Sequence, residues 1–396
     1  MNYVAPKHQA GQLQLAGILE RVCESLELSA SQFALAKQRY EGVGTYLANS
    51  GNAALRNLAI FLQGSTALGT TVKPIGINEH DVDLVAHVSD LDAQMSPAAL
   101  KRMIGDCLRA NGNYAPLLEE KLRCWRLNYA NEFHMDITPS IPNPECRLGG
   151  ELVPDKTLKA WKASNPKGYK RLFSERAKLM PRFRLQKHFA ADSARASVEP
   201  YPEAGGFKGI LRRAVQIGKR HRDMMFEDDP DVAPLSVIIT TLASRSYEWC
   251  VAKNVYDNEL EVLVDVAKHM PDTIQMSRVA NRDQWFIWNE TTAGENFAEK
   301  WNHHPERAEA FFAWHTRFCS DLDKLAAVQG LDQLGGMLRR LFGSQPANSA
   351  TALLTERVSE ARRSGSLYVA PSVGLSTAPV LGSTSVRANT FFGSSR

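Results

Sequence analysis

The sequence contains no Cys-x-x-Cys pair, no cysteine and histidine group with zinc-finger spacing, and no run of about 18 apolar residues. Its six cysteines are scattered along the chain, so we expect reduced thiols. The opening stretch MNYVAPKHQAGQLQL has no basic segment followed by an apolar one. Together these absences predict a cytoplasmic protein with no membrane segment.

The chain also lacks a large charge of either sign, since its formal net charge is +4 over 396 residues. Nucleic-acid binding therefore cannot be argued from overall charge, and local basic clusters must carry that case. With 44% hydrophobic and 23% charged residues, the composition is that of a globular protein that buries one large core or two ordinary ones.

The pattern of apolar residues predicts an α+β catalytic core with a mixed sheet, followed by helices. Residues 12–48 have helical periodicity, with an apolar face at i, i+3, i+4 and i+7 that contains Leu15, Ile18, Leu19 and Val22. Short β-like runs and one further helix follow, at 58–63, 81–88, 96–110 and 121–141. A strand, turn, helix, strand order of this kind favours an α+β fold.

Changes in composition divide the chain into three expected parts. Residues 1–200 form the catalytic core, and residues 201–345 form an α-helical domain that completes the pocket. Residues 346–396 are rich in Ser, Ala, Gly and Thr and have little periodicity, so we expect a flexible C-terminal tail.

Two aspartates, Asp81 and Asp83, stand one residue apart inside an expected strand. Residues i and i+2 of a strand face the same side, so both carboxylates share one site while Val82 and Leu84 face the core. A second alternating segment, 133–137, adds Asp136 on another strand. Carboxylates this close repel one another, and a divalent cation between them relieves the repulsion. Three of them can hold two Mg²⁺ ions for in-line displacement at phosphorus.

A Gly-Ser pair precedes these acids. Gly64 lets backbone N–H groups approach a phosphate, and Ser65 offers a hydroxyl donor directly after Gln63. Acidic strand pairs are often solvated edges and Gly-Ser pairs are usually turns, so each signal alone is weak. In this order, the acids and the Gly-Ser pair together predict a nucleotidyltransferase site.

These residues resemble the motif of the DNA polymerase β-like nucleotidyltransferases, which is Gly-Ser or Gly-Gly, an acid-x-acid pair and a distant third acid. The helix before the motif, AWKASNPKGYKRLF at 160–173 and the segment 215–247 resemble more narrowly the bacterial CD-NTases, the cGAS/DncV-like enzymes. The resemblance covers about residues 10 to 345.

The resemblance implies an activity and further site residues. Members of that family make cyclic oligonucleotides from ATP and other nucleoside triphosphates in CBASS anti-phage defence, with Mg²⁺, for which Mn²⁺ is a substitute. Lys219 and Ser236 resemble the lysine and serine that hold the donor triphosphate in related enzymes. The 215–247 segment is most similar to the clades that make trinucleotides, so cyclic tri-AMP is the expected product, with another cyclic trinucleotide or a cyclic dinucleotide as alternatives.

Two other functions stay open from the residues. One is a transferase of the same fold that acts on an RNA 3′ end or a small hydroxylated molecule, because the run 167–188 carries eight Lys or Arg against one acid. The other is a silent nucleotide-binding scaffold, against which the presence of all three acids argues. Related operons encode regulatory proteins that bind or conjugate the C-terminus, so the tail with Phe391 and Phe392 is also a candidate partner site.

Overall fold

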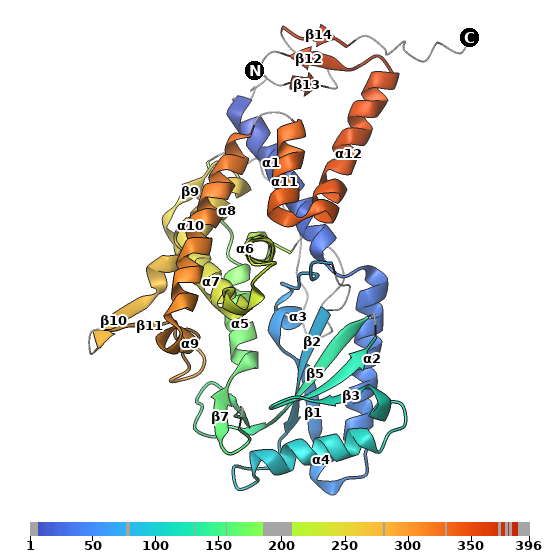
Figure 1. Cartoon of the computed structure of the whole chain (residues 1–396), viewed down its shortest axis with the longest axis vertical. Helices are drawn as coiled ribbons and strands as arrows, with labels where there is room; N and C mark the ends of the chain where they lie inside the picture. Colours follow the sequence, from blue (N-terminus) through green and yellow to red (C-terminus); the bar gives the residue numbers. More distant parts are fainter. Residues whose placement is uncertain are drawn as a thin grey trace.

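The computed structural model describes residues 7–76, 80–130, 132–155, 157–184, 208–279, 282–328, 331–370, 374–376, 379 and 382–386. The expected boundary near residue 200 lies outside these ranges, as do residues 185–188 of the basic run and the Phe391-Phe392 pair. Figure 1 shows a sheet at one end of the molecule and a group of helices at the other.

Two helices open the chain where the periodicity predicted one over residues 12–48. They are α1 (Lys7–Leu26) and α2 (Ala30–Ala48). The break has a local cause, because Ser29 forms a capping box in which its hydroxyl accepts the Gln32 N–H and the Gln32 side chain accepts the Ser29 N–H. The apolar face predicted for α1 is buried, so that part of the prediction is confirmed.

A seven-stranded mixed sheet forms the core of the first half. Its main path runs β1 (Leu58–Leu62), β2 (His80–Val88), β5 (Phe133–Pro142), β4 (Trp125–Tyr129) and β3 (Leu118–Glu120), and β6 (Glu151–Pro154) and β7 (Trp161–Ser164) extend it from β5. Within the described residues, β2 and β5 are the only parallel pair of neighbouring strands in this sheet, and the other pairs are antiparallel. The mixed α+β fold predicted from the sequence is therefore confirmed.

One face of this sheet is covered by apolar side chains. Val82 and Leu84 of β2 and Met135 of β5 are fully buried in a cluster with residues of α2 and of α4 (Pro97–Arg109). Helix α4 begins with Ser96 as its N-cap and Pro97 in its first turn, and its apolar stripe of Leu100, Ile104 and Leu108 has no exposed surface. The opposite face of β2 and β5 carries the polar side chains.

Helices build the second half around its own hydrophobic cluster. They are α5 (Pro166–Ala177), α6 (Ile210–Met225), α7 (Ser236–Lys253), α8 (Glu259–Lys268), α9 (Glu299–His303), α10 (Pro305–Ala327) and α11 (Leu331–Phe342). A hairpin of β10 (Gln275–Val279) and β11 (Arg282–Phe286), which the periodicity did not predict, projects from them (Figure 1). A second short pair, β8 (Arg182–Phe183) with β9 (Val255–Tyr256), is parallel.

The expected flexible tail differs from the structure over its first half. Residues 344–363 form helix α12 (Ser344–Arg363), which packs against α1 and α11, and a small sheet of β12 (Tyr368–Ala370), β13 (Gly374–Ser376) and β14 (Thr384–Ser385) follows. Helix α12 has low hydropathy, and its buried side chains include three small ones, those of Ala347, Ala350 and Ala361. Gly343, with φ +90°, separates α12 from α11.

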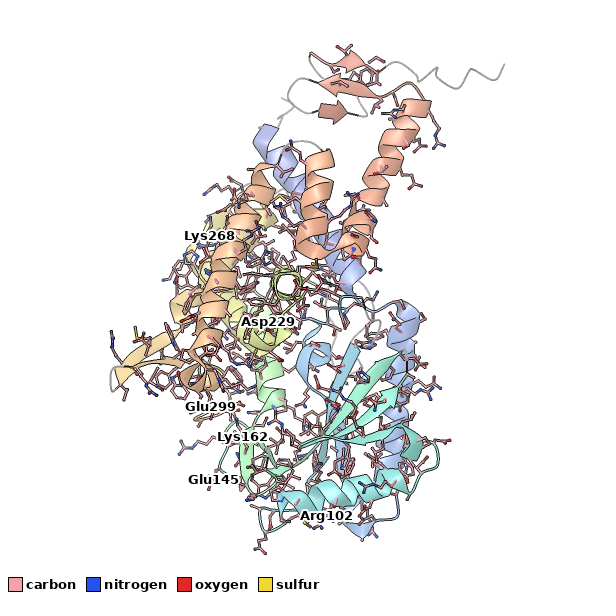
Figure 2. All side chains as sticks on the ribbon, viewed as in Figure 1. Arg102, Glu145, Lys162, Asp229, Lys268 and Glu299 are labelled. Carbon is pink, nitrogen blue, oxygen red and sulfur yellow. The ribbon has the colours of Figure 1, made fainter. Side chains whose placement is uncertain are left out.

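Charged side chains lie on the outside of both halves. Arg102 on α4, Lys268 on α8 and Glu299 on α9 are exposed, and Figure 2 shows them on well-separated parts of the surface. None of the helices in the described part of the chain combines the length and apolarity needed to cross a membrane.

A buried arginine joins the first helix to the helical half. Arg213 of α6 is 6% exposed, and its Nε donates to both carboxylate oxygens of Glu20 on α1, at 2.8 and 2.9 Å. Its Nη1 also pairs with Glu27, which lies just after the same helix. Removing one partner from a buried ion pair leaves the other charges uncompensated, which makes the change costly.

We therefore expect Arg213→Met to lower the free energy of unfolding by about 3 kcal/mol, measured by urea denaturation. The matched control is Arg278→Met, which removes an exposed pair with Asp283 at 3.9 Å and should change stability by less than about 0.5 kcal/mol. Equal losses in the two variants would show that the buried contact adds nothing.

Candidate active site

The register of β2 against β5 brings the three predicted aspartates onto one face of the sheet. Asp83 lies directly opposite Asp136, and Asp81 lies opposite His134. Because the side-chain period is two, all three carboxylates project away from the buried cluster, as the alternation predicts. The structure thus places these residues together, and their catalytic and metal-binding roles remain predictions.

The Gly-Ser pair lies directly over one of these carboxylates. Gly64 and Ser65 begin the short helix α3 (Gly64–Leu68), and Gln63 is tied to β2 by its N–H, which donates to the carbonyl of Asp83 at 2.9 Å. Gly64 has φ +64°, and a Cβ on it would stand 2.5 Å from Oδ2 of Asp83. Only glycine allows both this backbone conformation and this close approach.

Burial and neighbouring charge act together on Asp83. Burial is the main cause that raises its pKa, and the nearby carboxylates of Asp136 and Asp81 raise it further, to about 7. The carboxylate is therefore crowded and poorly solvated in the protein alone, a state that a bound cation would relieve.

Arg126 on β4 is a member of this site that the sequence analysis missed. Its Nε donates to Oδ1 of Asp136 at 2.6 Å, its Nη2 donates to Oδ2 of the same residue at 2.8 Å, and Nη2 also lies 3.4 Å from Oδ1 of Asp81. The segment CWRLNY alternates apolar and polar residues, so its period could have placed Arg126 on the acidic face. Its pairing with Asp136 depends on which strand lies beside β5, which the sequence did not predict.

Lys219 on α6 reaches the edge of the same site. It is 5% exposed, and its Nζ donates to the carbonyl of Thr70 at 3.1 Å and to the Thr70 hydroxyl at 3.2 Å. Burial lowers the pKa of this ammonium to about 8, with a further lowering by Arg222, while Asp83 is close enough to oppose it. A buried ammonium bonded to neutral oxygens suits an anionic ligand.

Ser236, the other predicted ligand of phosphate, begins helix α7 and is exposed. Its hydroxyl accepts hydrogen bonds from Nη1 and Nη2 of Arg222, both at 3.3 Å. Arg222 lies three residues after Lys219 on α6, so it adds a second cation beside the predicted pair. Arg222 was not among the residues predicted from the sequence.

The donor set on the sheet fits a hard divalent cation. Carboxylate oxygens are the ligands that Mg²⁺ prefers, and Asp81, Asp83 and Asp136 supply them on adjacent strands. In the protein alone, the guanidinium of Arg126 supplies the positive charge among these carboxylates.

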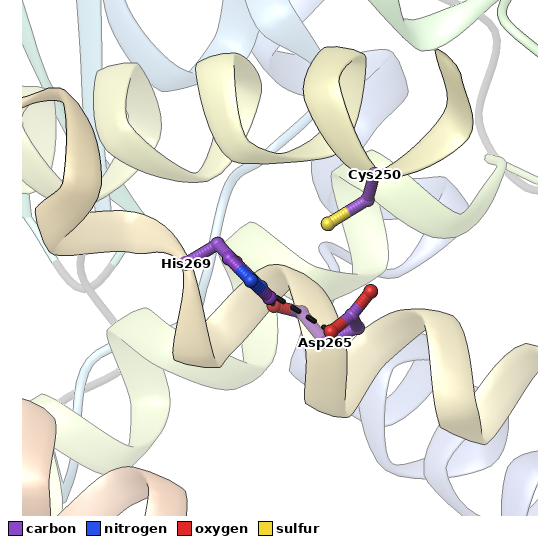
Figure 3. Close-up of side chains that lie close together, drawn as sticks. All are labelled: Cys250, Asp265 and His269. Atoms are coloured by element: carbon purple, nitrogen blue, oxygen red, sulfur yellow. Dashed lines mark hydrogen bonds and ion pairs between the residues drawn. The ribbon is translucent and has the colours of Figure 1, made fainter. Parts of the chain in front are cut away.

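A second group of ligand-type residues lies in the helical half. Among the described residues, Cys250, Asp265 and His269 place their donor atoms within 4.8 Å of one another (Figure 3). Asn254 and Tyr256 donate to Oδ2 of Asp265 at 2.7 and 2.6 Å, and His269 Nδ1 lies 3.2 Å from its Oδ1. Burial raises the pKa of the Cys250 thiol to about 11, so we interpret the group as a structural hydrogen-bond network.

Three arginines of the basic run make contacts within the protein. Arg176 pairs with Glu290 and with Glu248 on α7. Arg182 donates to the carbonyl of Ala252 near the end of α7, and Arg184 pairs with Asp257 beyond it. These three arginines therefore connect α5 and β8 to other elements of the helical half.

The chain is similar to known proteins over most of its length. Residues 14–176 match the family described as Second Messenger Oligonucleotide or Dinucleotide Synthetase domain. The chain is 28% identical over 389 residues to a c-di-GMP synthase of Roseivirga ehrenbergii, an alignment that covers 96% of this chain and 97% of that protein. It is 25% identical over 414 residues to the cyclic dinucleotide synthase CdnG of Bradyrhizobium diazoefficiens, with 96% and 95% covered.

The fold is also similar to a solved structure, that of the Bradyrhizobium diazoefficiens CD-NTase CdnG in complex with GTP. The TM-score is 0.62 at 19% sequence identity, and the match covers 86% of this chain and 99% of that one. The similarity extends over both the sheet and the helical half.

The close approach at residue 64 leads to a prediction with a matched control. Gly64→Ala and Gly51→Ala both place an alanine at positive φ, at +64° and +74°, but a Cβ at Gly51 meets nothing within 4 Å. Each change should cost about 1 kcal/mol for the backbone conformation, and only Gly64→Ala should cost more, measured by thermal unfolding. In an Asp83→Ala background the two costs should become equal. A persistent difference would mean that Asp83 is not the cause.

The buried ammonium leads to a second prediction. The folded-state pKa of Lys219 is below its unfolded value, so the unfolded chain binds the proton more tightly than the folded protein does. The charged ammonium therefore lowers the free energy of unfolding, and this cost is at its full size below about pH 8. We expect Lys219→Met to raise the free energy of unfolding by about 1 to 3 kcal/mol at pH 7, a gain that shrinks between about pH 8 and 10.

The control is Lys101→Met. Lys101 is equally buried but has a carboxylate partner, Glu120, at 2.8 Å, so its removal should lower stability. Losses of stability in both variants would contradict the interpretation of Lys219 as a costly buried charge.

Proposed function

Because this chain belongs to the bacterial CD-NTase family of nucleotidyltransferases, we propose that it joins two nucleoside triphosphates into a cyclic dinucleotide, with GTP as the leading substrate. Its activity is the synthesis of a cyclic oligonucleotide second messenger. The observation that carries the proposal is the register that sets Asp83 opposite Asp136, with Asp81 on the same face and Gly64 above them.

The choice of product departs from the expectation drawn from the sequence, which was cyclic tri-AMP. Both relatives that align over 96% of this chain are named as cyclic dinucleotide synthases, and one of them is named for c-di-GMP. The names of these relatives favour a dinucleotide over a trinucleotide, and the name of the first favours guanine over adenine.

In the proposed reaction, a ribose hydroxyl of one nucleotide attacks the α-phosphorus of another. A new phosphate ester bond forms, the bond to pyrophosphate breaks, and the hydroxyl proton is lost to the surrounding base or solvent. A second transfer of the same kind closes the ring. Each turnover of two triphosphates therefore releases two pyrophosphates.

We assign the following roles to the residues of the site. The carboxylates of Asp81, Asp83 and Asp136 would hold two Mg²⁺ ions, or Mn²⁺ in their place, which neutralise phosphate charge and lower the pKa of the attacking hydroxyl. Gly64 lets the backbone lie directly against Asp83, and Ser65 would offer a hydroxyl donor to a phosphate.

The helical half supplies cations to the leaving group. The Lys219 ammonium and the Ser236 hydroxyl would donate to the donor triphosphate, with Arg222 between them as a third donor. Because Lys219 already contacts Thr70 near the end of α3, its position is tied to the Gly-Ser segment. This arrangement would hold the pyrophosphate opposite the attacking hydroxyl.

The test is product analysis with a matched pair of double variants. Purified protein with Mg²⁺ and a mixture of the four nucleoside triphosphates should yield a phosphatase-resistant cyclic dinucleotide. The product is identified by mass spectrometry before and after linkage-specific nuclease digestion. Asp81→Asn with Asp83→Asn should reduce product formation by at least about 10³-fold, because both carboxylates at the reacting phosphates lose their charge.

The control changes Asp90→Asn and Asp92→Asn, two exposed aspartates just beyond the other end of β2, and should leave activity unchanged. A cyclic trinucleotide would restore the original expectation for the product. Open-chain oligomers alone, or full activity of the Asp81 and Asp83 double variant, would contradict the proposed function.

A further inference from the structure

Arg126 pairs with two of the three carboxylates to which a divalent cation would bind. Its guanidinium engages both oxygens of Asp136, at 2.6 and 2.8 Å, in the fork geometry that arginine makes with carboxylates. The same Nη2 group lies 3.4 Å from Oδ1 of Asp81. One side chain thus contacts carboxylates on two strands, β2 and β5.

This ion pair contributes little to holding the fold together. Arg126 and Asp136 are already neighbours in the antiparallel ladder of β4 and β5, so their pairing joins no distant elements. The Arg126 side chain is 21% exposed and that of Asp81 is 59% exposed, so water screens the 3.4 Å contact between these two residues. Arg176 and Arg213, by contrast, pair with acids on separate helices.

The contact has a direct consequence for the ligands. A carboxylate oxygen that accepts a short hydrogen bond from a guanidinium is a poorer ligand, and a positive charge beside it repels a cation. Asp136 has both oxygens engaged by Arg126, whereas Asp83 is the carboxylate that lies beneath Gly64. The carboxylate of Asp136 is therefore not free to bind a cation while Arg126 stays in place.

We propose that Arg126 is a positioning residue that takes the place of the divalent cation in the nucleotide-free protein and is drawn off the aspartates when a triphosphate binds. The inference rests on the proposed function, since it takes the three aspartates as the cation site. A phosphate offers the guanidinium the same forked hydrogen bonds that Asp136 does. When the Arg126 guanidinium exchanges Asp136 for a phosphate, the Asp136 carboxylate becomes free to bind a cation. The guanidinium then pairs with the substrate.

Coupling between nucleotide and cation follows from this exchange. If the triphosphate removes Arg126 from the aspartates, it tightens cation binding, and by linkage the cation tightens nucleotide binding by the same factor. The aspartates stay neutralised at each stage, first by Arg126 and then by the cation. Arg126 thereby limits the repulsion among the carboxylates in the nucleotide-free protein.

The experiment measures Mn²⁺ binding to the full chain by calorimetry and by the electron paramagnetic resonance signal of free Mn²⁺, with and without a nonhydrolysable GTP analogue. Without nucleotide, Arg126→Met should bind Mn²⁺ about tenfold more tightly than the unaltered protein, because a competing charge is gone. With the analogue, the added tightening should be largely lost in the variant. Arg126→Lys, which keeps the charge but loses the fork, should fall between the two.

Controls separate this inference from the proposed function. Arg109→Met removes an arginine that lies 2.7 Å from Asp106 in the same half and should leave Mn²⁺ affinity unchanged. Asp83→Asn should abolish Mn²⁺ binding, and Mn²⁺ binding that survives this change would overturn the proposed site itself. Circular dichroism checks that each variant is folded.

Asp83-dependent Mn²⁺ binding that is equal in Arg126→Met and the unaltered protein, with the same response to nucleotide, would overturn the role of Arg126 and leave the proposed function standing. Weaker Mn²⁺ binding by folded Arg126→Met would also overturn it, because it would make Arg126 a support of the cation site.

Discussion

Parallel pairing of β2 with β5 forces two carboxylates, Asp83 and Asp136, to face each other across adjacent strands, and Asp81 stands on the same face. Their mutual repulsion is the constraint to which the surrounding residues respond. Gly64 leaves Asp83 uncovered by a side chain, Arg126 neutralises Asp136 and Asp81, and Lys219 stands at the far edge. Apolar packing of Val82 and Leu84 against α2 and α4 stabilises the strands that carry this charge.

The helical half supplies further cations beside those of the sheet. Lys219 and Arg222 lie on α6, which is anchored to α1 through Arg213 and its two glutamates. A buried ammonium without a carboxylate partner costs stability, and the large hydrophobic cluster around α6 and α7 offsets that cost. The two halves therefore hold opposite charges apart in the free protein, in positions where a metal-bound triphosphate would bridge them.

Much of this arrangement could be predicted from the sequence because a period of two is a strong signal. The alternation around Asp81, Asp83 and Asp136 placed the three acids on one face, and the helical pattern of residues 15–22 identified the buried face of α1. Lys219 and Ser236 came from resemblance to a family. The break at Ser29 was missed because a capping box is a local contact inside an otherwise helical pattern.

The remaining features depend on tertiary contacts that a pattern does not contain. The partner of Arg126 is decided by which strand lies beside β5, and α12, which has buried alanines, is held by its packing against α1 and α11. The hairpin of β10 and β11 interrupts a region whose surroundings are helical. The product could not be predicted from the three aspartates, since their proposed ligands are metal and phosphate, which are common to all nucleoside triphosphates.

The most direct measurement is a crystal structure of the protein with Mg²⁺ and a nonhydrolysable GTP analogue. The account predicts a metal ion bound by Asp81 and Asp83, the triphosphate between Gly64 and Lys219, and Arg126 turned from Asp136 toward phosphate. A triphosphate bound away from the three aspartates, with the Arg126 to Asp136 fork unchanged, would contradict it.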